Sequence, residues 1–111
     1  MRLRDIWRVR IPFAPGHAQA GERPALIIQN DAFLPPLPTV LIVPFTGTLA
    51  AARFPGTLVV QPDAQNGLSA FSVALVFQTR ALDKRDLVRK MGELDHASFD
   101  QVLDMLRQLT T

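Results

Sequence analysis

The sequence predicts an α+β domain that is mainly β, built as a small antiparallel barrel of short strands with one C-terminal amphipathic helix packed against it. Two observations lead to this prediction. Short apolar runs rich in β-forming residues are separated by segments that contain proline and glycine, and the last segment instead has helical periodicity. With 111 residues, the chain has room for a single domain spanning residues 1–111.

The first two predicted strands differ in pattern. Residues 6–11 alternate apolar and basic side chains toward their end, so Arg8 and Arg10 should project to the same, wet side. A long loop with prolines and glycines follows. Residues 25–28 are then continuously apolar, which is typical of a strand covered on both faces.

The middle of the chain alternates strands with irregular segments. Residues 32–38 contain three prolines and predict a connector rather than a helix or central strand. Residues 39–46 predict a third strand, in which Pro44 indicates an edge position or a bulge near the end. A loop of small residues is expected over 47–55, and a fourth strand over 56–61.

The next part of the chain is less uniform. Residues 63–67 predict a turn and residues 72–78 a fifth strand. The charged segment 79–87 predicts a turn or a single helical turn. Periodicity alone does not decide whether residues 87–94 form a short strand or a helix.

The C-terminal segment predicts an amphipathic helix. Asp95 is a suitable N-cap residue. Apolar residues spaced to form one stripe on such a helix are Phe99, Val102, Leu103, Leu106 and Leu109.

Composition excludes several classes of protein. Without cysteine the chain has no disulfide and no thiolate nucleophile, which agrees with a cytoplasmic location. The charged N-terminus lacks the apolar core of a signal peptide, and no apolar run approaches the length of a membrane span. The two histidines, His17 and His96, are far apart in sequence, so we expect no metal site.

The net charge of +2 is unevenly distributed. Residues 1–23 and residues 80–90 each carry a local charge of +3, whereas residues 93–107 carry −3. Such asymmetry favours a groove for a polyanion on one side of the molecule. Solvated charged faces are the alternative interpretation.

The segment from Pro15 to Asp31, PGHAQAGERPALIIQND, contains the most specific motif. Pro24 restricts Arg23 to an extended conformation at the point where loop becomes strand. The segment resembles the G-x-E-Q-x-G-x-R-P-x-L-V-I-x-N-D signature of the MazF/PemK toxin family, which are sequence-selective endoribonucleases of bacterial toxin–antitoxin pairs. The resemblance extends from Asp5 to about Asp95 and implies an SH3-like barrel.

The resemblance also implies catalytic residues. Arg23 matches the arginine of the R-P pair, which is regarded as catalytic in the family, and a guanidinium suits a phosphoryl group that gains charge. Thr46 matches the hydroxyl residue of V-x-P-x-T and could bond a phosphoryl oxygen or align the 2′-OH. His17 matches a histidine of some members and is a natural proton carrier. The alternative for Arg23 is an ion pair with Glu22 or Asp31.

Further residues are expected to contact RNA or brace the site. Gln19 matches the E-Q glutamine and Arg80 the arginine of Q-x-R-x-I-D; the alternative for Arg80 is a buried ion pair with Asp83. Asn30 follows the second strand, where Gln29, Asn30 and Asp31 should hold the turn and the Arg23 loop. Arg8 and Arg10 complete the expected RNA-binding set.

Two departures from the family pattern concern the general base. Ala18 replaces the glutamate of G-x-E-Q, and Phe77 stands where many members have an acidic residue; Leu75 stands where some have an arginine. Glu22 or His17 would then have to take the proton, so a weakened or altered ribonuclease is one interpretation.

Together these features predict a homodimeric, metal-independent endoribonuclease toxin without a cofactor. It would cut single-stranded RNA to a 2′,3′-cyclic phosphate and a 5′-hydroxyl. Its expected partner is a cognate antitoxin whose flexible acidic tail lies in the RNA groove. The alternatives are a binding toxin on the same fold, such as a gyrase poison, and a degenerate toxin that binds RNA or antitoxin without cutting.

Overall fold

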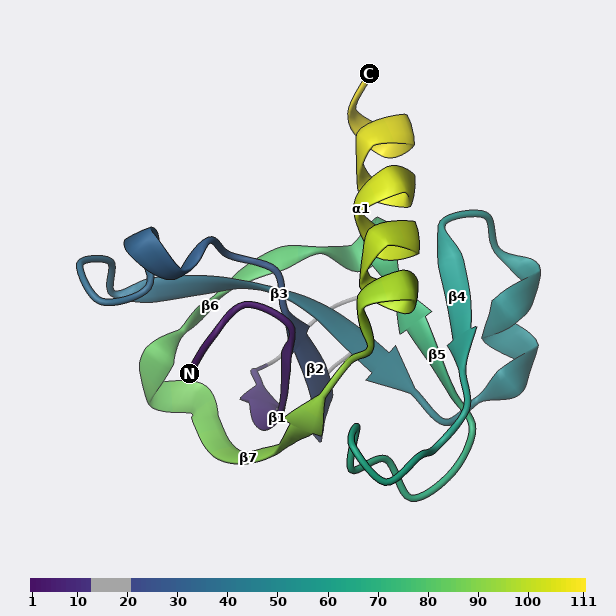
Figure 1. Ribbon diagram of the computed structural model, residues 1–111, viewed down its shortest axis with the longest axis horizontal. Coiled ribbons are helices and arrows are strands. Elements are labelled where there is room, and N and C mark those ends of the chain that lie inside the picture. The colour runs from purple at the N-terminus through teal and green to yellow at the C-terminus, as the bar shows by residue number, and fades with distance from the viewer. Residues whose placement is uncertain (13–20) are drawn as a thin grey trace.

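The computed structural model describes residues 1–12 and 21–111, in which strands of one antiparallel sheet are followed by a C-terminal helix (Figure 1). His17, Gln19 and Ala18 lie outside the described residues. The strands and the helix are β1 (Asp5–Ile11), β2 (Gly21–Ile27), β3 (Thr39–Thr46), β4 (Thr57–Val60), β5 (Ser72–Leu75), β6 (Arg80–Asp83), β7 (Leu87–Glu93) and α1 (His96–Thr110).

The seven strands are connected around β3. The hydrogen-bonded path runs β4-β5-β3-β2-β1-β7, and β6 pairs with β3 beside it. On one edge β3 pairs with β2; on the other it pairs first with β6, over Thr39–Ile42, and then with β5, at Phe45 and Thr46. The predicted edge position of Pro44 is therefore wrong, because this central strand accommodates the proline where its neighbour changes. Among the described strands the path ends at β4 and β7 without pairing them, so closure into a barrel stays a prediction.

Both faces of the sheet are covered by apolar side chains. One cluster contains Leu26 and Phe45 and packs against Phe99 and Val102 of α1. The second lies on the other face and includes Val9, Ala25, Ile27, Val40, Ile42 and Leu82. This arrangement confirms that the apolar run of residues 25–28 is buried on both sides.

The terminal helix α1 begins as predicted. The Asp95 carboxylate accepts a hydrogen bond from the Ser98 N–H at 3.0 Å and caps the helix. Phe99 and Val102 are buried, while Leu109 is 47% exposed, because the last turn extends beyond the sheet (Figure 1). The predicted apolar stripe is thus buried only along its first part. No helix in residues 1–12 or 21–111 is long and apolar enough to cross a membrane.

Several predicted elements are corrected. Within the charged segment 79–87, residues 80–83 form β6, because they pair with the first half of β3 and bury Leu82. Only Lys84–Asp86 form the expected turn. The open question over residues 87–94 is resolved as the strand β7.

Short 3₁₀ turns account for the remaining differences. The predicted fifth strand ends at Leu75, since Val76–Gln78 form such a turn. The small-residue loop contains another, Leu49–Arg53, and Asp31–Phe33 open the proline-rich connector with a third.

Candidate functional site

Arg23 and Thr46, far apart in sequence, are brought together by the pairing of β2 with β3. The observed register sets Ala25 opposite Pro44 and Leu26 opposite Val43. Continued by two residues, the same register sets Arg23 opposite Thr46. A hydrogen bond of 3.3 Å from Nη1 of Arg23 to the carbonyl oxygen of Phe45 ties the two strand ends together.

The two side chains belong to the same face of the sheet. Arg23 is directly across from Val9, which lies in the second apolar cluster, and opposed residues of an antiparallel pair share a face. Thr46 has the same parity along β3 as Ile42, which also lies in that cluster. The guanidinium of Arg23 is half-buried, and burial lowers its pKa from the ordinary value by desolvating the charged form. Because a guanidinium is strongly basic, Arg23 remains a cation at neutral pH despite this lowering.

The hydroxyl of Thr46 is fixed by a local backbone bond. Thr46 is only 6% exposed, and its Oγ1 accepts a hydrogen bond from the N–H of Thr48 at 3.2 Å. This bond occupies one lone pair of Oγ1, and the hydroxyl hydrogen can still be donated to a second group. No atom of the described residues lies within 4 Å of the position where a Cβ on Gly47 would sit, so these residues leave the turn open on that side.

Arg80 lies on the same face at the start of β6. It is opposite Ile42 and half-buried, and it has no ion pair with any residue in the described part of the chain. Asp83 instead pairs with Arg85 at 3.0 Å, and the hydrogen bond from the Arg85 side chain lowers the pKa of Asp83. The alternative of a buried Arg80–Asp83 ion pair is therefore wrong.

Arg8 and Arg10 lie on the opposite face from Arg23. Both flank Val9 on β1, and strand alternation turns them away from the side on which Val9 and Arg23 lie. Nε of Arg8 pairs with the Glu22 carboxylate at 2.7 Å. Glu22 thus lies with the arginines and is not turned toward the face of Thr46.

The residues after β2 hold a turn at the other end of the strand. Oδ1 of Asn30 accepts the N–H of Ala32 at 2.9 Å, and the Gln29 amide donates to the Phe33 carbonyl at 2.8 Å. Asp31 accepts the N–H of Leu3 and lies 3.9 Å from Arg2. These bonds confirm the predicted role in the turn. At about 3.3 Å per residue, however, Asn30 is roughly 20 Å along the chain from Arg23, so the structure does not bring them together.

Phe77 and Leu75 supply no polar group to this face. Leu75 is 1% exposed, and Phe77 lies beyond the end of β5 with its ring 5.7 Å from that of Phe54. Two backbone groups of the site, the Phe45 carbonyl and the Thr48 N–H, were not predicted from the sequence. The second had a detectable signal, since a threonine two residues before an N–H is a common side-chain turn.

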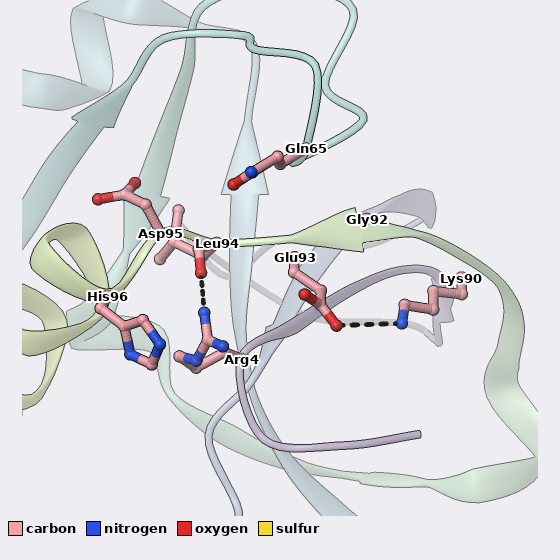
Figure 2. A pocket seen from close by; sticks show the side chains of 8 residues that line it. All are labelled: Arg4, Gln65, Lys90, Gly92, Glu93, Leu94, Asp95 and His96. Atoms are coloured by element: carbon pink, nitrogen blue, oxygen red, sulfur yellow. Dashed lines mark hydrogen bonds and ion pairs between the residues drawn. The ribbon is translucent and has the colours of Figure 1, made fainter.

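A separate pocket of about 560 Å³ lies near the start of α1 (Figure 2). Arg4, whose φ is +75°, donates from Nη1 to the Leu94 carbonyl at 2.6 Å there, and Lys90 pairs with Glu93 at 3.4 Å. Cations and carboxylates balance within this pocket. It lies at the opposite end of β1 from Val9 and Arg23, so it is not part of the arginine–threonine site.

Comparisons with known proteins identify the family of the chain. Residues 2–110 match the model of a family described as PemK-like, MazF-like toxin of type II toxin–antitoxin system. Over 102 residues the chain is 32% identical to endoribonuclease MazF of Staphylococcus saprophyticus subsp. saprophyticus, covering 92% of this chain and 84% of that protein. Over 104 residues it is 33% identical to endoribonuclease EndoA of Bacillus subtilis, covering 93% and 88%.

Solved structures have the same fold. The crystal structure of MazF from Deinococcus radiodurans superposes with a TM-score of 0.84 at 22% identity, covering 99% of this chain and 96% of that one. A mycobacterial endoribonuclease in complex with its cognate antitoxin gives a TM-score of 0.75 at 21% identity, covering 99% and 94%. The chain therefore belongs to the family of PemK-like, MazF-like toxins of type II toxin–antitoxin systems.

Proposed function

We propose that this protein is an endoribonuclease toxin that cuts single-stranded RNA at short sequences by attack of a 2′-OH on the adjacent phosphorus. The products are a 2′,3′-cyclic phosphate and a 5′-hydroxyl, and no metal takes part. The observation that supports this most is the apposition of Arg23 and Thr46 on one face of the sheet, tied by the bond from Arg23 to the Phe45 carbonyl.

Arg23 neutralises the charge that grows on the phosphoryl oxygens during attack. Its planar fork matches two such oxygens, and partial burial strengthens the attraction because less water screens it. Thr46 donates its hydroxyl hydrogen to a phosphoryl oxygen rather than accepting from the 2′-OH. The bond from the Thr48 N–H supports that assignment, because it occupies one of the two lone pairs of the oxygen and leaves the hydroxyl hydrogen to be donated. Arg80 contacts a flanking phosphate from the same face.

His17 acts as the general base and general acid. The two carboxylate positions of the family hold Ala18 and Phe77, and Glu22 is paired with Arg8 on the other face. An imidazole with an ordinary pKa near 6.5 can take the 2′-OH proton and return one to the leaving oxygen. Gln19 lies two residues further along and braces a base or the loop.

The test is cleavage of diverse single-stranded RNA in EDTA with mapping of the ends. We expect 2′,3′-cyclic phosphate ends from the wild type and a loss of at least 100-fold in Arg23→Ala. Arg107→Ala is the matched control, because Arg107 is an exposed arginine of α1 paired with Asp104. Intact RNA with the wild type, or equal cutting by Arg23→Ala, would contradict the proposal.

We propose that an antitoxin with a flexible acidic tail regulates the protein by covering Arg23. A solved neighbour is an endoribonuclease in complex with its cognate antitoxin, which supports such a partner. The association rate should fall with salt, since the Debye length shortens from about 10 Å at 0.1 M to about 3 Å at 1 M. A rate that does not change with salt, or simultaneous binding of RNA and antitoxin, would contradict this model.

We also propose a homodimer with an SH3-like barrel in each subunit, acting in the cytoplasm where mRNA is met. Exposed apolar side chains near β4 and the end of α1, among them Val59, Phe77 and Leu109, support a covering partner. Light scattering at micromolar concentration tests the dimer, and a stable monomer would refute it.

A non-cutting toxin is the second candidate, and the loss of both family carboxylates favours it. Such a protein would arrest growth by poisoning a target such as gyrase, or would only bind RNA or antitoxin. Growth arrest with intact RNA and damaged DNA would identify the gyrase poison, whereas RNA binding without cutting would identify the degenerate toxin.

A further inference from the structure

A cationic surface lies on the face of the sheet opposite Arg23. Arg8 and Arg10 project there from β1, and β7 places Arg89 directly across from Arg8. We call Arg8, Arg10 and Arg89 the arginine face. Like charges directly opposed on neighbouring strands repel, so this pairing works against folding of the free protein.

The arginine face is only partly neutralised. Glu22 pairs with Arg8 through Nε, and the terminal nitrogens of that guanidinium have no hydrogen bond to any residue of ranges 1–12 and 21–111. Arg10 and Arg89 are exposed, and neither has an ion pair with any residue of ranges 1–12 and 21–111. Three arginines against one carboxylate leave a local charge of +2.

Two other exposed arginines each have a carboxylate partner. Arg85 pairs with Asp83 at 3.0 Å, and Arg107 pairs with Asp104 at 2.7 Å. Each of these pairs is local and neutral. Arg53 and Arg80 also lack an ion pair among the described residues, so the arginine face is distinguished by grouping: its three arginines lie on adjacent strands, and Glu22 is the carboxylate paired with them.

We propose that the arginine face binds phosphates of the RNA that flank the cleaved bond, so that substrate RNA engages both faces of the β1–β2 pair. This inference rests on the proposed ribonuclease function. Val9 lies across from Arg23 on one face while its chain neighbours Arg8 and Arg10 occupy the other, so both surfaces share the same stretch of β1. Arginine forks with unoccupied terminal nitrogens match phosphate oxygens in pairs.

The role of Arg89 gives the sharpest test, because Arg89 lies outside the residues assigned to cleavage. Equilibrium binding is measured with RNA that carries a 2′-deoxy group at the cut, in a long form and in a form trimmed to the cut sequence. Arg89→Gln should weaken binding of the long RNA several-fold. It should also reduce the salt slope of that binding, log K against log salt, by about 0.7. The trimmed RNA should bind equally well to both proteins.

Two controls isolate the position of the charge. Arg107→Gln removes the same charge from α1 and should leave both affinities unchanged, and Arg89→Lys should restore most of the slope. Arg10→Gln should reproduce the effect of Arg89→Gln. Thermal melts of each variant confirm that the fold is retained.

The outcomes separate this inference from the proposed function. Equal losses of RNA affinity in Arg89→Gln and Arg107→Gln would refute RNA binding by the arginine face. Equal losses of affinity for long and trimmed RNA in Arg89→Gln would refute it as well. If the wild type cuts RNA and Arg89→Gln has the same salt slope of RNA binding as the wild type, only the proposed role of the arginine face would be refuted. A wild type that fails to cut but binds long RNA through Arg89 would refute the ribonuclease and retain the face, and no RNA binding at all would refute both.

Discussion

The bond from the Thr48 N–H to Thr46 can be removed without touching either side chain. Thr48 has a φ of −79°, which is close to the value that proline requires, and the preceding residue, Gly47, has no Cβ to clash with the ring. Thr48→Pro therefore deletes the N–H donor and little else. Thr48→Ala keeps that donor and is the matched control, while Thr46→Val deletes the hydroxyl itself.

The expected magnitudes differ between the variants. Thr46→Val loses a donor to the charge that develops on the phosphoryl group, which is worth about 100- to 1,000-fold in rate. Thr48→Pro keeps the Thr46 hydroxyl but removes the hydrogen bond that orients it. A net hydrogen bond is worth about 1 kcal/mol, or about fivefold in the population of the oriented hydroxyl, so we expect a loss of about fivefold. Thr48→Ala should cut at the wild-type rate.

Single-turnover cleavage of RNA with one sulfur at the scissile phosphate provides the assay. Sulfur accepts hydrogen bonds poorly, so the substitution that faces Thr46 should slow the wild type and Thr48→Ala but have little further effect on Thr46→Val. Because Thr46 is nearly buried and valine has its shape, the variant should remain folded. Cleavage by Thr46→Val within twofold of wild type, or equal damage from Thr48→Ala and Thr48→Pro, would refute the reasoning.

Three predictions concern stability. Asp95→Ala should cost about 1 kcal/mol by thermal unfolding; the Ser98 N–H lowers the pKa of Asp95, so the contribution is present above the ordinary pKa of about 3.9 and is lost as pH falls through the folded value. The hydrogen bond to buried Asp5 raises the pKa of Lys90, so stability should be lost as pH rises through that raised value, and Lys90→Met should abolish this alkaline dependence. Gly92→Ala would place a Cβ 2.2 Å from the Gln65 carbonyl oxygen and should destabilise by about 1–3 kcal/mol, whereas Gly47→Ala, with open space, should not.

Local patterns predicted the elements whose burial matches their periodicity. The alternation in β1 correctly turned Arg8 and Arg10 to one side, and the spacing of Phe99 and Val102 with an aspartate at the N-cap gave α1. Each of these signals lies within one segment of chain. The Arg23–Thr46 apposition, by contrast, was expected only from a family resemblance, because it depends on the register between two strands.

Pairing between distant segments explains the errors. Residues 80–83 have the composition of a turn, and they become a strand because β3 offers an unpaired edge at Thr39–Ile42. Pro44 suggested an edge because a proline removes one donor, yet β3 changes partner at that point and tolerates the loss. The expected groove lined by Arg8 or Arg10 together with Arg23 is likewise wrong, because successive residues of β1 and β2 face opposite sides of the sheet.

The polar end of β2 fixes the register of the strand, which its apolar part specifies only weakly. Ala25, Leu26 and Ile27 are buried on both faces, so a slip of one residue against β1 would exchange one set of apolar side chains for another at little hydrophobic cost. At Glu22 and Arg23 the same slip would break the ion pair to Arg8 and turn the guanidinium away from the Phe45 carbonyl. The Arg8–Glu22 pair lies on one face of the sheet and the Arg23–Phe45 bond belongs to the residue facing the other side, and both require the same alignment of β2. The residues that give each face its chemistry therefore also help to fix the strand alignment on which both surfaces depend.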